Sequence, residues 1–173
     1  SGDDAWRPVA PAALHLTLCF LGDQLAEKIG AIAQACASGL AEGDIPVTAA
    51  PVLTLAAPVL TLAAPLVLGP RRGRVLAVAL EDPAKTLGVV QGRLAQSLAA
   101  GGWYEPESRP YVAHVTVARA RRGARAPAAS AYPAPSALGF QATTVSLLRS
   151  RLGGPSPRYE RLATVELAPS TRP

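Results

Sequence analysis

Hydrophobic and polar residues alternate in several separate segments of the chain, which is the pattern of half-buried β-strands. The clearest segment is residues 14–21, Leu-His-Leu-Thr-Leu-Cys-Phe-Leu, which ends at Gly22. In a strand, Leu14, Leu16, Leu18 and Phe20 would share one face, and the residues between them the other. We expect further strands over residues 74–81 and 111–118 and near residues 140–149 and 159–167.

Two other segments carry apolar residues at intervals of three and four, which predicts amphipathic helices. The first covers residues 24–40 and follows Asp23, a candidate N-cap. The second follows Asp82-Pro83, a candidate N-cap and first helical residue, and ends at Gly101-Gly102. Their apolar positions are Leu25, Ile29, Ile32, Cys36 and Leu40 in the first, and Leu87, Val90, Leu94 and Leu98 in the second. The order of strand, helix and strands occurs twice, so we expect an α+β fold of two similar halves rather than a doubly wound parallel sheet.

Residues 50–63 contain the sequence Ala-Pro-Val-Leu-Thr-Leu-Ala twice in succession. Seven residues are too few for the repeat unit of a solenoid, so we expect a local duplication within a longer hairpin or loop. Pro51, Pro58 and Pro65 argue against a long central strand. They also interrupt the longest apolar stretch, so no membrane span is expected. Residues 120–137 are rich in Arg, Ala, Pro and Ser and predict a mobile loop.

The composition fits one compact domain over residues 1–173, because 49% of the residues are hydrophobic and only 17% are charged. The net charge is +5 and almost all positive charge is arginine, since lysine occurs only at Lys28 and Lys85. Arginine suits phosphate ligands; the alternative is that the arginines merely reflect a GC-rich genome.

Two cysteines exclude a disulfide framework and a Cys-rich zinc site, and they favour a reducing cytoplasm. We expect no signal peptide, and the absence of methionine predicts missing N-terminal residues.

Each of the two histidines is followed, two residues later, by a threonine. His15-Leu16-Thr17-Leu18 and His114-Val115-Thr116-Val117 share the pattern His-apolar-Thr-apolar within an alternating segment. In a strand, the histidine and threonine of each motif lie on one face, about 6.6 Å apart. Each motif therefore offers an imidazole and a hydroxyl side by side.

Two such motifs on facing strands can act on one phosphorus atom. One imidazole serves as the base and the other as the acid of an in-line displacement. The threonine hydroxyls can donate hydrogen bonds to the non-bridging phosphate oxygens. No carboxylate, metal or cofactor is required. The alternative, two strand histidines that simply face solvent, leaves the two matched threonines unexplained.

These motifs and their flanking residues resemble the two-histidine (2H) phosphoesterase superfamily, which is defined by two His-x-Thr/Ser motifs in pseudo-symmetric lobes. Within it the chain is most similar to the RNA 2',3'-cyclic phosphodiesterases, also called 2'-5' RNA ligases (LigT-like). Residues 14–22 resemble the family's first motif with its Phe-Leu-Gly ending, and residues 109–119 resemble the second. Residues 146–150, with Tyr159 downstream, resemble the closing strand pair, so the likeness runs from about residue 7 to residue 168.

The resemblance implies a bilobal α+β domain, in which each lobe is an antiparallel sheet with a packed helix and the active-site cleft lies between the lobes. It implies that His15 and His114 are the catalytic pair and that Thr17 and Thr116 bind the phosphate. Arg119 matches a basic position that often follows the second motif. Strand alternation puts Arg119 on the face opposite His114 unless the strand ends or bulges first, so a surface arginine is the alternative. The family usually begins with an additional strand and helix, which we expect this domain to lack.

The implied reaction is hydrolysis of RNA 2',3'-cyclic phosphate ends to 2'-phosphates by a monomeric, cytoplasmic enzyme with no metal, no cofactor and no membrane association. A small cyclic nucleotide, or another cyclic phosphate, is an alternative substrate. 2'-5' RNA ligation at the same site is an alternative activity. A non-catalytic module that binds RNA ends is a third reading, but paired imidazoles favour catalysis over binding alone.

Other residues fit two interpretations each. Cys19 stands where the family often has a basic residue, and Ala113 where it usually has proline. Trp103 and Tyr104 could stack on a base, but a role in the core at a helix end is favoured, and Cys36 is expected in the core. Two arginine groups, Arg71, Arg72 and Arg74 and then Arg121, Arg122 and Arg125, form either an RNA-binding rim or solvated loops.

Overall fold

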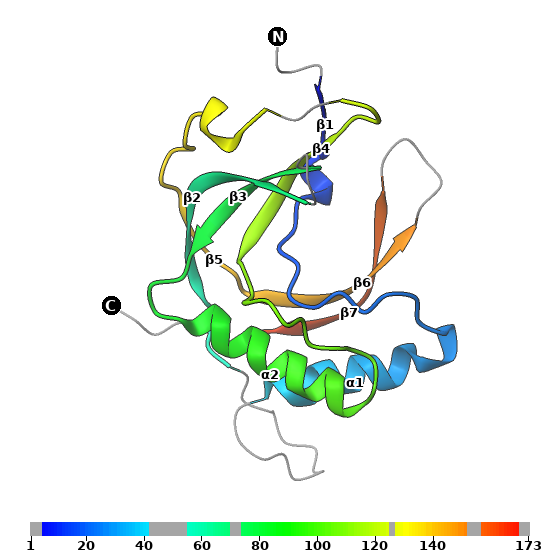
Figure 1. Ribbon diagram of the computed structural model, residues 1–173. Coiled ribbons are helices and arrows are strands. Elements are labelled where there is room, and N and C mark those ends of the chain that lie inside the picture. The colour runs from blue at the N-terminus through cyan, green and yellow to red at the C-terminus, as the bar shows by residue number, and fades with distance from the viewer. Residues whose placement is uncertain (1–4, 42–54, 70–73, 125–126, 152–156, 170–173) are drawn as a thin grey trace.

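The computed structural model describes residues 5–41, 55–69, 74–124, 127–151 and 157–169, which form two antiparallel sheets and two α-helices (Figure 1). The larger sheet has the strand order β1-β4-β3-β2-β5, and the smaller one pairs β6 with β7. The strands are β1 (Trp6–Pro8), β2 (Val59–Leu68), β3 (Val75–Glu81), β4 (His114–Ala120), β5 (Gly139–Gln141), β6 (Thr144–Arg151) and β7 (Arg158–Glu166). The α+β fold class expected from the sequence is confirmed.

The two helices, α1 (Ile29–Leu40) and α2 (Thr86–Ala100), pack against each other along one side of the molecule (Figure 1). Gly39 permits their close approach, because a Cβ atom there would lie 2.8 Å from Ser97 Cβ and 3.1 Å from the carbonyl oxygen of Arg93. The Ser97 hydroxyl also donates a 2.8 Å hydrogen bond to the carbonyl oxygen of Ala35.

The main core lies between this helix pair and the small sheet. Its buried members are Ile32, Cys36, Leu40, Ala57, Val90, Leu94, Leu98 and Leu167. Val145, Leu147 and Val165 of β6 and β7 pack against it, as do the partly buried Trp103 and Tyr104. The core role that the sequence favoured for Cys36, Trp103 and Tyr104 is therefore confirmed.

A second, smaller core joins the large sheet to the start of α2. It consists of Leu60, Leu80 and Leu87, and both Leu16 and Val115 pack against it. These two residues separate the histidine from the threonine in their respective motifs. Their apolar contacts hold the backbone of both motifs against the sheet.

Both predicted helices are present, but both begin later than the sequence indicated. Leu25 is 65% exposed and precedes a 3-10 turn, Ala26–Lys28, that leads into α1. The N-cap position of α2 is Lys85, not Asp82. The Asp82 carboxylate still accepts hydrogen bonds from the backbone N–H groups of Thr86, at 3.1 Å, and Gly88, at 3.2 Å. Asp82 thus satisfies the free N–H groups of the first turn from outside the helix.

The expectation that Pro51, Pro58 and Pro65 argue against a long central strand is wrong for the second half of this region. β2 has 10 residues, includes Pro65, and lies between β3 and β5. Its pairing with β5 is limited to Val59–Thr61, so Pro65 faces a partner on one side only. The register with β3 also shifts between Leu62 and Pro65. Proline lacks an N–H donor, and a bulge on a locally unpaired edge is where a strand tolerates it. Residues 50–54 of the first copy lie outside the described residues.

The alternating segment at residues 14–21 is not a strand. Its backbone makes one isolated antiparallel bridge, between Leu16 and Val115. Leu16 and Leu18 pack into the cores as expected, but Leu14 is 44% and Phe20 79% exposed. Cys19 packs against the main core instead of sharing a face with His15. The alternation predicted a sheet, but only the middle of the segment contacts one.

The other predicted strands are present, but one predicted segment is divided into two strands. The segment near residues 140–149 forms two strands, β5 and β6, and the segment near residues 159–167 forms β7. Between β4 and β5, the described part of residues 120–137 forms a single 3-10 turn, Ala129–Ala131, and otherwise no strand or helix. No helix within the described ranges is long and apolar enough to cross a membrane.

Candidate active site

The Leu16–Val115 bridge brings the two histidine motifs together. In an antiparallel pair the two residue numbers add up to a constant, so this register sets His15 beside Thr116 and Thr17 beside His114. Leu16 and Val115 point into the small core, so their neighbours project from the other side. The motifs are related by a local two-fold axis through the bridge.

Both imidazoles are oriented by the backbone in the same way. Nδ1 of His15 lies 2.8 Å from the carbonyl oxygen of Ala13, and Nδ1 of His114 lies 2.8 Å from that of Val112. A carbonyl oxygen can only accept, so each Nδ1 carries a hydrogen and donates it. Each Nε2 is then the nitrogen that is available to take up or release a proton. The two rings therefore have the tautomer that acid–base catalysis at Nε2 needs.

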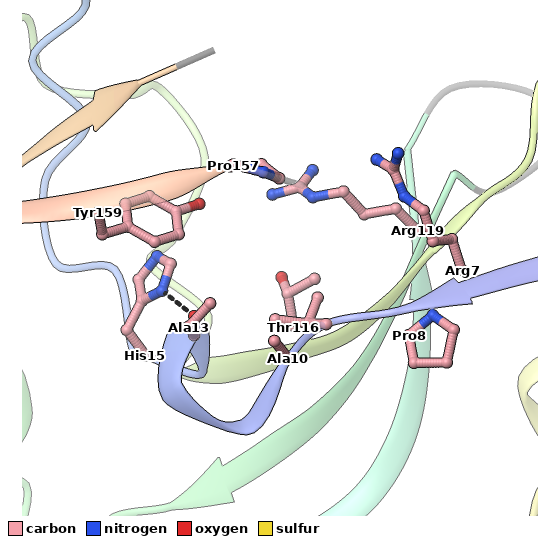
Figure 2. Close-up of a pocket in the computed structure, with 10 residues that line it drawn as sticks. Arg7, Pro8, Ala10, Ala13, His15, Thr116, Arg119, Pro157 and Tyr159 are labelled. Atoms are coloured by element: carbon pink, nitrogen blue, oxygen red, sulfur yellow. Dashed lines mark hydrogen bonds between the residues drawn. The ribbon is translucent and has the colours of Figure 1, made fainter. Parts of the chain in front are cut away.

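A pocket lies beside the first histidine, between the edge of the large sheet and β7 (Figure 2). His15 and Thr116 line it together, as the register requires, and Arg7, Arg119 and Tyr159 complete its polar lining. Its other lining residues are Pro8, Val9, Ala10, Ala13 and Pro157. Thr17 and His114 are not among the lining residues, so this pocket represents one half of the paired motifs.

Arg119 reaches the pocket because β4 contains a bulge. Ala77 pairs with Thr116, but the next residue of β3, Leu76, pairs with Ala118, which leaves Val117 as the extra residue. The bulge reverses the alternation, so Thr116 and Arg119 face the pocket together while Ala118 is buried. The alternative that Arg119 lies on the far face is therefore excluded.

Tyr159 of β7 supplies an aromatic contact to the first histidine. The two ring centroids are 4.6 Å apart and the planes meet at 66°, an edge-to-face arrangement (Figure 2). Together with the bond from Nδ1 to Ala13, this contact restricts the imidazole of His15 from two sides. Sequence reasoning placed Tyr159 in the closing strand pair but gave it no role in the site. No local pattern marks it, because it comes from the other sheet.

Tyr111 supports the other half of the motif pair. Its hydroxyl donates a 3.0 Å hydrogen bond to the carbonyl oxygen of Thr17. Burial raises the pKa of Tyr111, with a smaller contribution from Cys19, so the phenol remains a donor at every physiological pH. The bond ties the backbone of the first motif to the segment that leads into β4.

Cys19, at the position where a basic residue was expected from the resemblance, contributes no charge. Burial raises the pKa of its thiol to about 11, and proximity to Cys36 adds to the effect. A neutral thiol packed against the helices neither binds a phosphate nor acts as a nucleophile.

The remaining arginines are not part of the pocket. Arg74, Arg121 and Arg122 are exposed and do not line it, whereas Arg71, Arg72 and Arg125 lie outside the described residues. An RNA-binding rim formed by these side chains stays a prediction. In the part of the chain that the structure describes, no three His, Cys, Asp or Glu side chains gather closely enough to hold a metal ion.

Comparison with known proteins agrees with this geometry. The sequence profile of the 2'-5' RNA ligase superfamily matches residues 3–154, most of the chain. The protein therefore belongs to the 2'-5' RNA ligase superfamily of 2H phosphoesterases.

Similar solved structures share the fold over most of their length. TT0787 of Thermus thermophilus is 24% identical with a TM-score of 0.69, covering 94% of this chain and 82% of that one. LigT of E. coli, in complex with 3'-AMP, is 26% identical with a TM-score of 0.66, covering 95% and 83%. A protein described as a phosphoesterase is 25% identical with a TM-score of 0.69, covering 95% and 83%. No curated protein sequence gives a significant match.

Proposed function

We propose that the protein hydrolyses the 2',3'-cyclic phosphate at the end of an RNA strand and leaves a 2'-phosphate. The observation that carries this proposal is the two-fold pairing of the motifs about the Leu16–Val115 bridge, with Nδ1 of each histidine bound to a backbone carbonyl. Two imidazoles with available Nε2 atoms, flanked by two hydroxyls, match a displacement at phosphorus that needs one base and one acid. LigT of E. coli is solved with 3'-AMP, which supports a ribonucleotide ligand in this fold.

In the proposed reaction, Nε2 of His114 takes a proton from water as the water oxygen forms a bond to phosphorus. The bond between phosphorus and O3' breaks, and its electron pair stays on O3'. Nε2 of His15 donates its proton to that oxygen, which becomes the 3'-hydroxyl. The phosphate remains attached to O2'. The resemblance motivates this division of roles, since the two motifs are nearly symmetric.

The threonines and Arg119 act on the charge of the phosphate. Hydroxyls of Thr17 and Thr116 donate hydrogen bonds to non-bridging oxygens, whose negative charge grows as the fifth bond to phosphorus forms. Arg119 lines the same pocket as Thr116 and adds a fixed positive charge. None of the described residues that line the pocket is acidic.

Two further functions remain open for the same site. Ligation that forms a 2'-5' linkage is the same displacement with the 5'-hydroxyl of a second strand in place of water: its oxygen bonds to phosphorus, its proton goes to Nε2 of His114, and the bond from phosphorus to O3' breaks. A different cyclic phosphate could also be the substrate. We expect the enzyme to act as a cytoplasmic monomer, and the free thiols of Cys19 and Cys36 fit a reducing compartment.

The decisive experiment offers an oligoribonucleotide with a 2',3'-cyclic phosphate end and identifies the new end group. We expect a 2'-phosphate, and a loss of about 10²–10⁴-fold in rate for His15→Ala and for His114→Ala. Thr116→Val should slow the reaction, whereas Thr144→Val, an exposed threonine at the start of β6, serves as the matched control. Binding of the RNA end without turnover would support the non-catalytic reading instead. A 3'-phosphate product would contradict the proposed geometry of cleavage.

A further inference from the structure

The two histidine motifs differ in the charge of the residues that follow them. Beyond Thr116, the third residue is Arg119, which lines the same pocket. Beyond Thr17, the third residue is Phe20, which is uncharged and exposed. Cys19 is neutral as well and packs against the main core. The first motif therefore brings no cation of its own to its half of the site.

β7 presents an arginine on the same face as Tyr159. Arg161 follows Tyr159 by two residues, and the register of β7 with β6 is regular between them, so both side chains project from one face. The partner of Arg161 on β6 is Leu148, whose neighbour Leu147 packs against the main core. Arg161 therefore faces away from that core, and it is exposed. Because Tyr159 contacts His15, this face is the one directed at the motifs.

The course of β7 along the pocket indicates where Arg161 lies. Pro157 and Tyr159 both line the pocket, and Figure 2 shows Tyr159 beside His15 and Pro157 toward Arg119. The strand thus runs from the Arg119 end of the pocket to the His15 end. Arg161 is two residues further, about 6.6 Å along the strand, and lies beyond the first histidine.

The other half of the paired motifs lies in the same direction. On β4, His114 is two residues from Thr116, on the side away from Arg119. The bridge between the motifs sets Thr17 beside His114. β7 therefore carries Arg161 to the level of Thr17 and His114, the half of the site that lies outside the pocket.

Packing against the main core gives the same direction independently. The residue after Thr17 is Leu18, which packs against this core, and Val165, further along β7 than Arg161, packs against it too. The first motif and β7 thus both leave the pocket toward the helices. Arg161 and Thr17 lie between the pocket and the core on these two segments.

Glu160 does not share the face of Arg161. It lies between Tyr159 and Arg161 on β7, so the alternation of the strand turns its carboxylate to the other side. There it accepts hydrogen bonds from Arg149, at 2.9 and 3.2 Å, and from Arg151, at 2.9 Å. Arg161 takes part in no ion pair within the part of the chain that the structure describes. Its guanidinium is a cation on the side of the strand that faces the motifs.

We propose that Arg161 binds the reacting phosphate from the half of the site that contains Thr17 and His114, as the counterpart of Arg119 on the other half. This inference rests on the proposed function and adds a phosphate-binding residue to it. A guanidinium can donate two parallel hydrogen bonds to two oxygens of one phosphate. Because the non-bridging oxygens gain negative charge as water adds to phosphorus, this contact stabilises the transition state as well as the bound substrate.

The first test uses adenosine 2',3'-cyclic phosphate, whose only phosphate is the reacting one. Arg161→Gln should lower kcat/KM by about 10- to 100-fold, the scale of a hydrogen bond to a charged group. Arg161→Lys keeps the charge and should lose less. Arg158→Gln is the matched control, because Arg158 is an exposed arginine on the opposite face of the same strand.

Two kinetic outcomes would contradict the inference. Equal values of kcat/KM for Arg161→Gln and Arg158→Gln would show that Arg161 is an ordinary surface arginine. A loss that occurs only with a dinucleotide carrying the same cyclic end would show that Arg161 binds the upstream phosphodiester instead of the reacting phosphate.

A binding measurement separates this inference from the proposed reaction. Adenosine 2'-monophosphate should bind the wild-type protein more tightly than adenosine does, and Arg161→Gln should reduce this advantage about tenfold, whereas Arg158→Gln should preserve it. No advantage in the wild type, or an unchanged advantage in Arg161→Gln, overturns the inference even if cyclic phosphates are hydrolysed. A reduced advantage without hydrolysis of any cyclic substrate supports the phosphate contact and overturns the proposed function. Circular dichroism of each variant verifies that the fold is retained.

Discussion

Leu16 and Val115 form a single antiparallel bridge, and the local two-fold axis through it relates the two His-x-Thr motifs. Both side chains pack into the core beneath the large sheet. Because of this bridge, the histidine of each motif is directed toward the threonine of the other motif. His15 and Thr116 therefore line one pocket although they lie about 100 residues apart in the sequence.

The proposed roles of the histidines predict different responses to the leaving group. A ribose oxygen leaves poorly and needs a proton, whereas a nitrophenolate leaves without one. His15→Ala should thus lose far more activity on the cyclic RNA end than on an accepted nitrophenyl phosphodiester, and His114→Ala should lose about 10²–10⁴-fold on both. Rescue of His114→Ala by the nitrophenyl substrate would reverse the assignment. Rescue of neither would refute a simple division into acid and base.

Tyr159 is predicted to act as a positioning residue for His15. Tyr159→Phe preserves the ring contact and should retain activity, whereas Tyr159→Ala should lower kcat on the cyclic substrate by about 10–100-fold, because the imidazole is no longer held in place. The loss should be smaller on the nitrophenyl substrate, as for His15→Ala. An equal loss on both substrates would indicate a general structural role for Tyr159.

We predict that hydrolysis does not depend on a metal ion. Paired imidazoles and hydroxyls supply the acid, the base and the contacts to the phosphate oxygens, and no metal-binding cluster of side chains occurs among the described residues. The rate should be the same before and after treatment with EDTA. Loss of activity that added Mg²⁺, Mn²⁺ or Zn²⁺ restores would refute this.

The partly buried thiol of Cys19 gives a prediction that depends on pH. Its pKa of about 11, against an ordinary 9.0, leaves about 100-fold less thiolate at pH 8. Only the thiolate reacts, so iodoacetamide should modify Cys19 about 100-fold more slowly in the folded protein than in urea. The difference should shrink as the pH rises toward 11. Peptide mass spectrometry follows the modification of Cys19 separately from that of Cys36, which stays in place because its proximity contributes to the raised pKa.

The contact between the two helices predicts opposite effects for two substitutions in α1. Gly39→Ala should lower the free energy of unfolding by about 1–3 kcal/mol, because the added methyl group meets Ser97 at 2.8 Å. Gly30→Ala, in the same helix with no atom near its Cβ position, should raise it by up to about 1 kcal/mol. Urea unfolding measures both. A stabilising Gly39→Ala would show that the helices can separate without cost.

The periodic spacing of apolar residues predicted the helices, because the apolar face of a helix is determined by one segment of the chain. Leu87, Val90, Leu94 and Leu98 are all buried in α2, because one apolar face of a helix needs only something to cover it. The alternation at residues 14–21 predicted a strand, but a strand also needs a partner along its length, and only Leu16 has one. Pairing is a property of two segments, so neither segment alone can predict it.

In the candidate site, too, some residues were predictable from a local motif and others depend on the folded chain. His15, His114, Thr17 and Thr116 were predicted from two short motifs, and the structure brings His15 and Thr116 together in one pocket. The approach of Arg119 to Thr116 depends on the bulge at Val117, which no local signal marks. The partners that complete the pocket, Arg7 and Tyr159, come from β1 and from the other sheet, so only the folded chain brings them to the motifs.

The acceptors that orient the two imidazoles are main-chain oxygens, at Ala13 and Val112. Every amino acid supplies that carbonyl group, so substitution at either position leaves the acceptor itself in place. In a site where an aspartate orients the histidine, a single codon change can remove the orienting group. Here the tautomer of both imidazoles is protected against such changes, and the sequence around the motifs can change as long as the backbone path is kept.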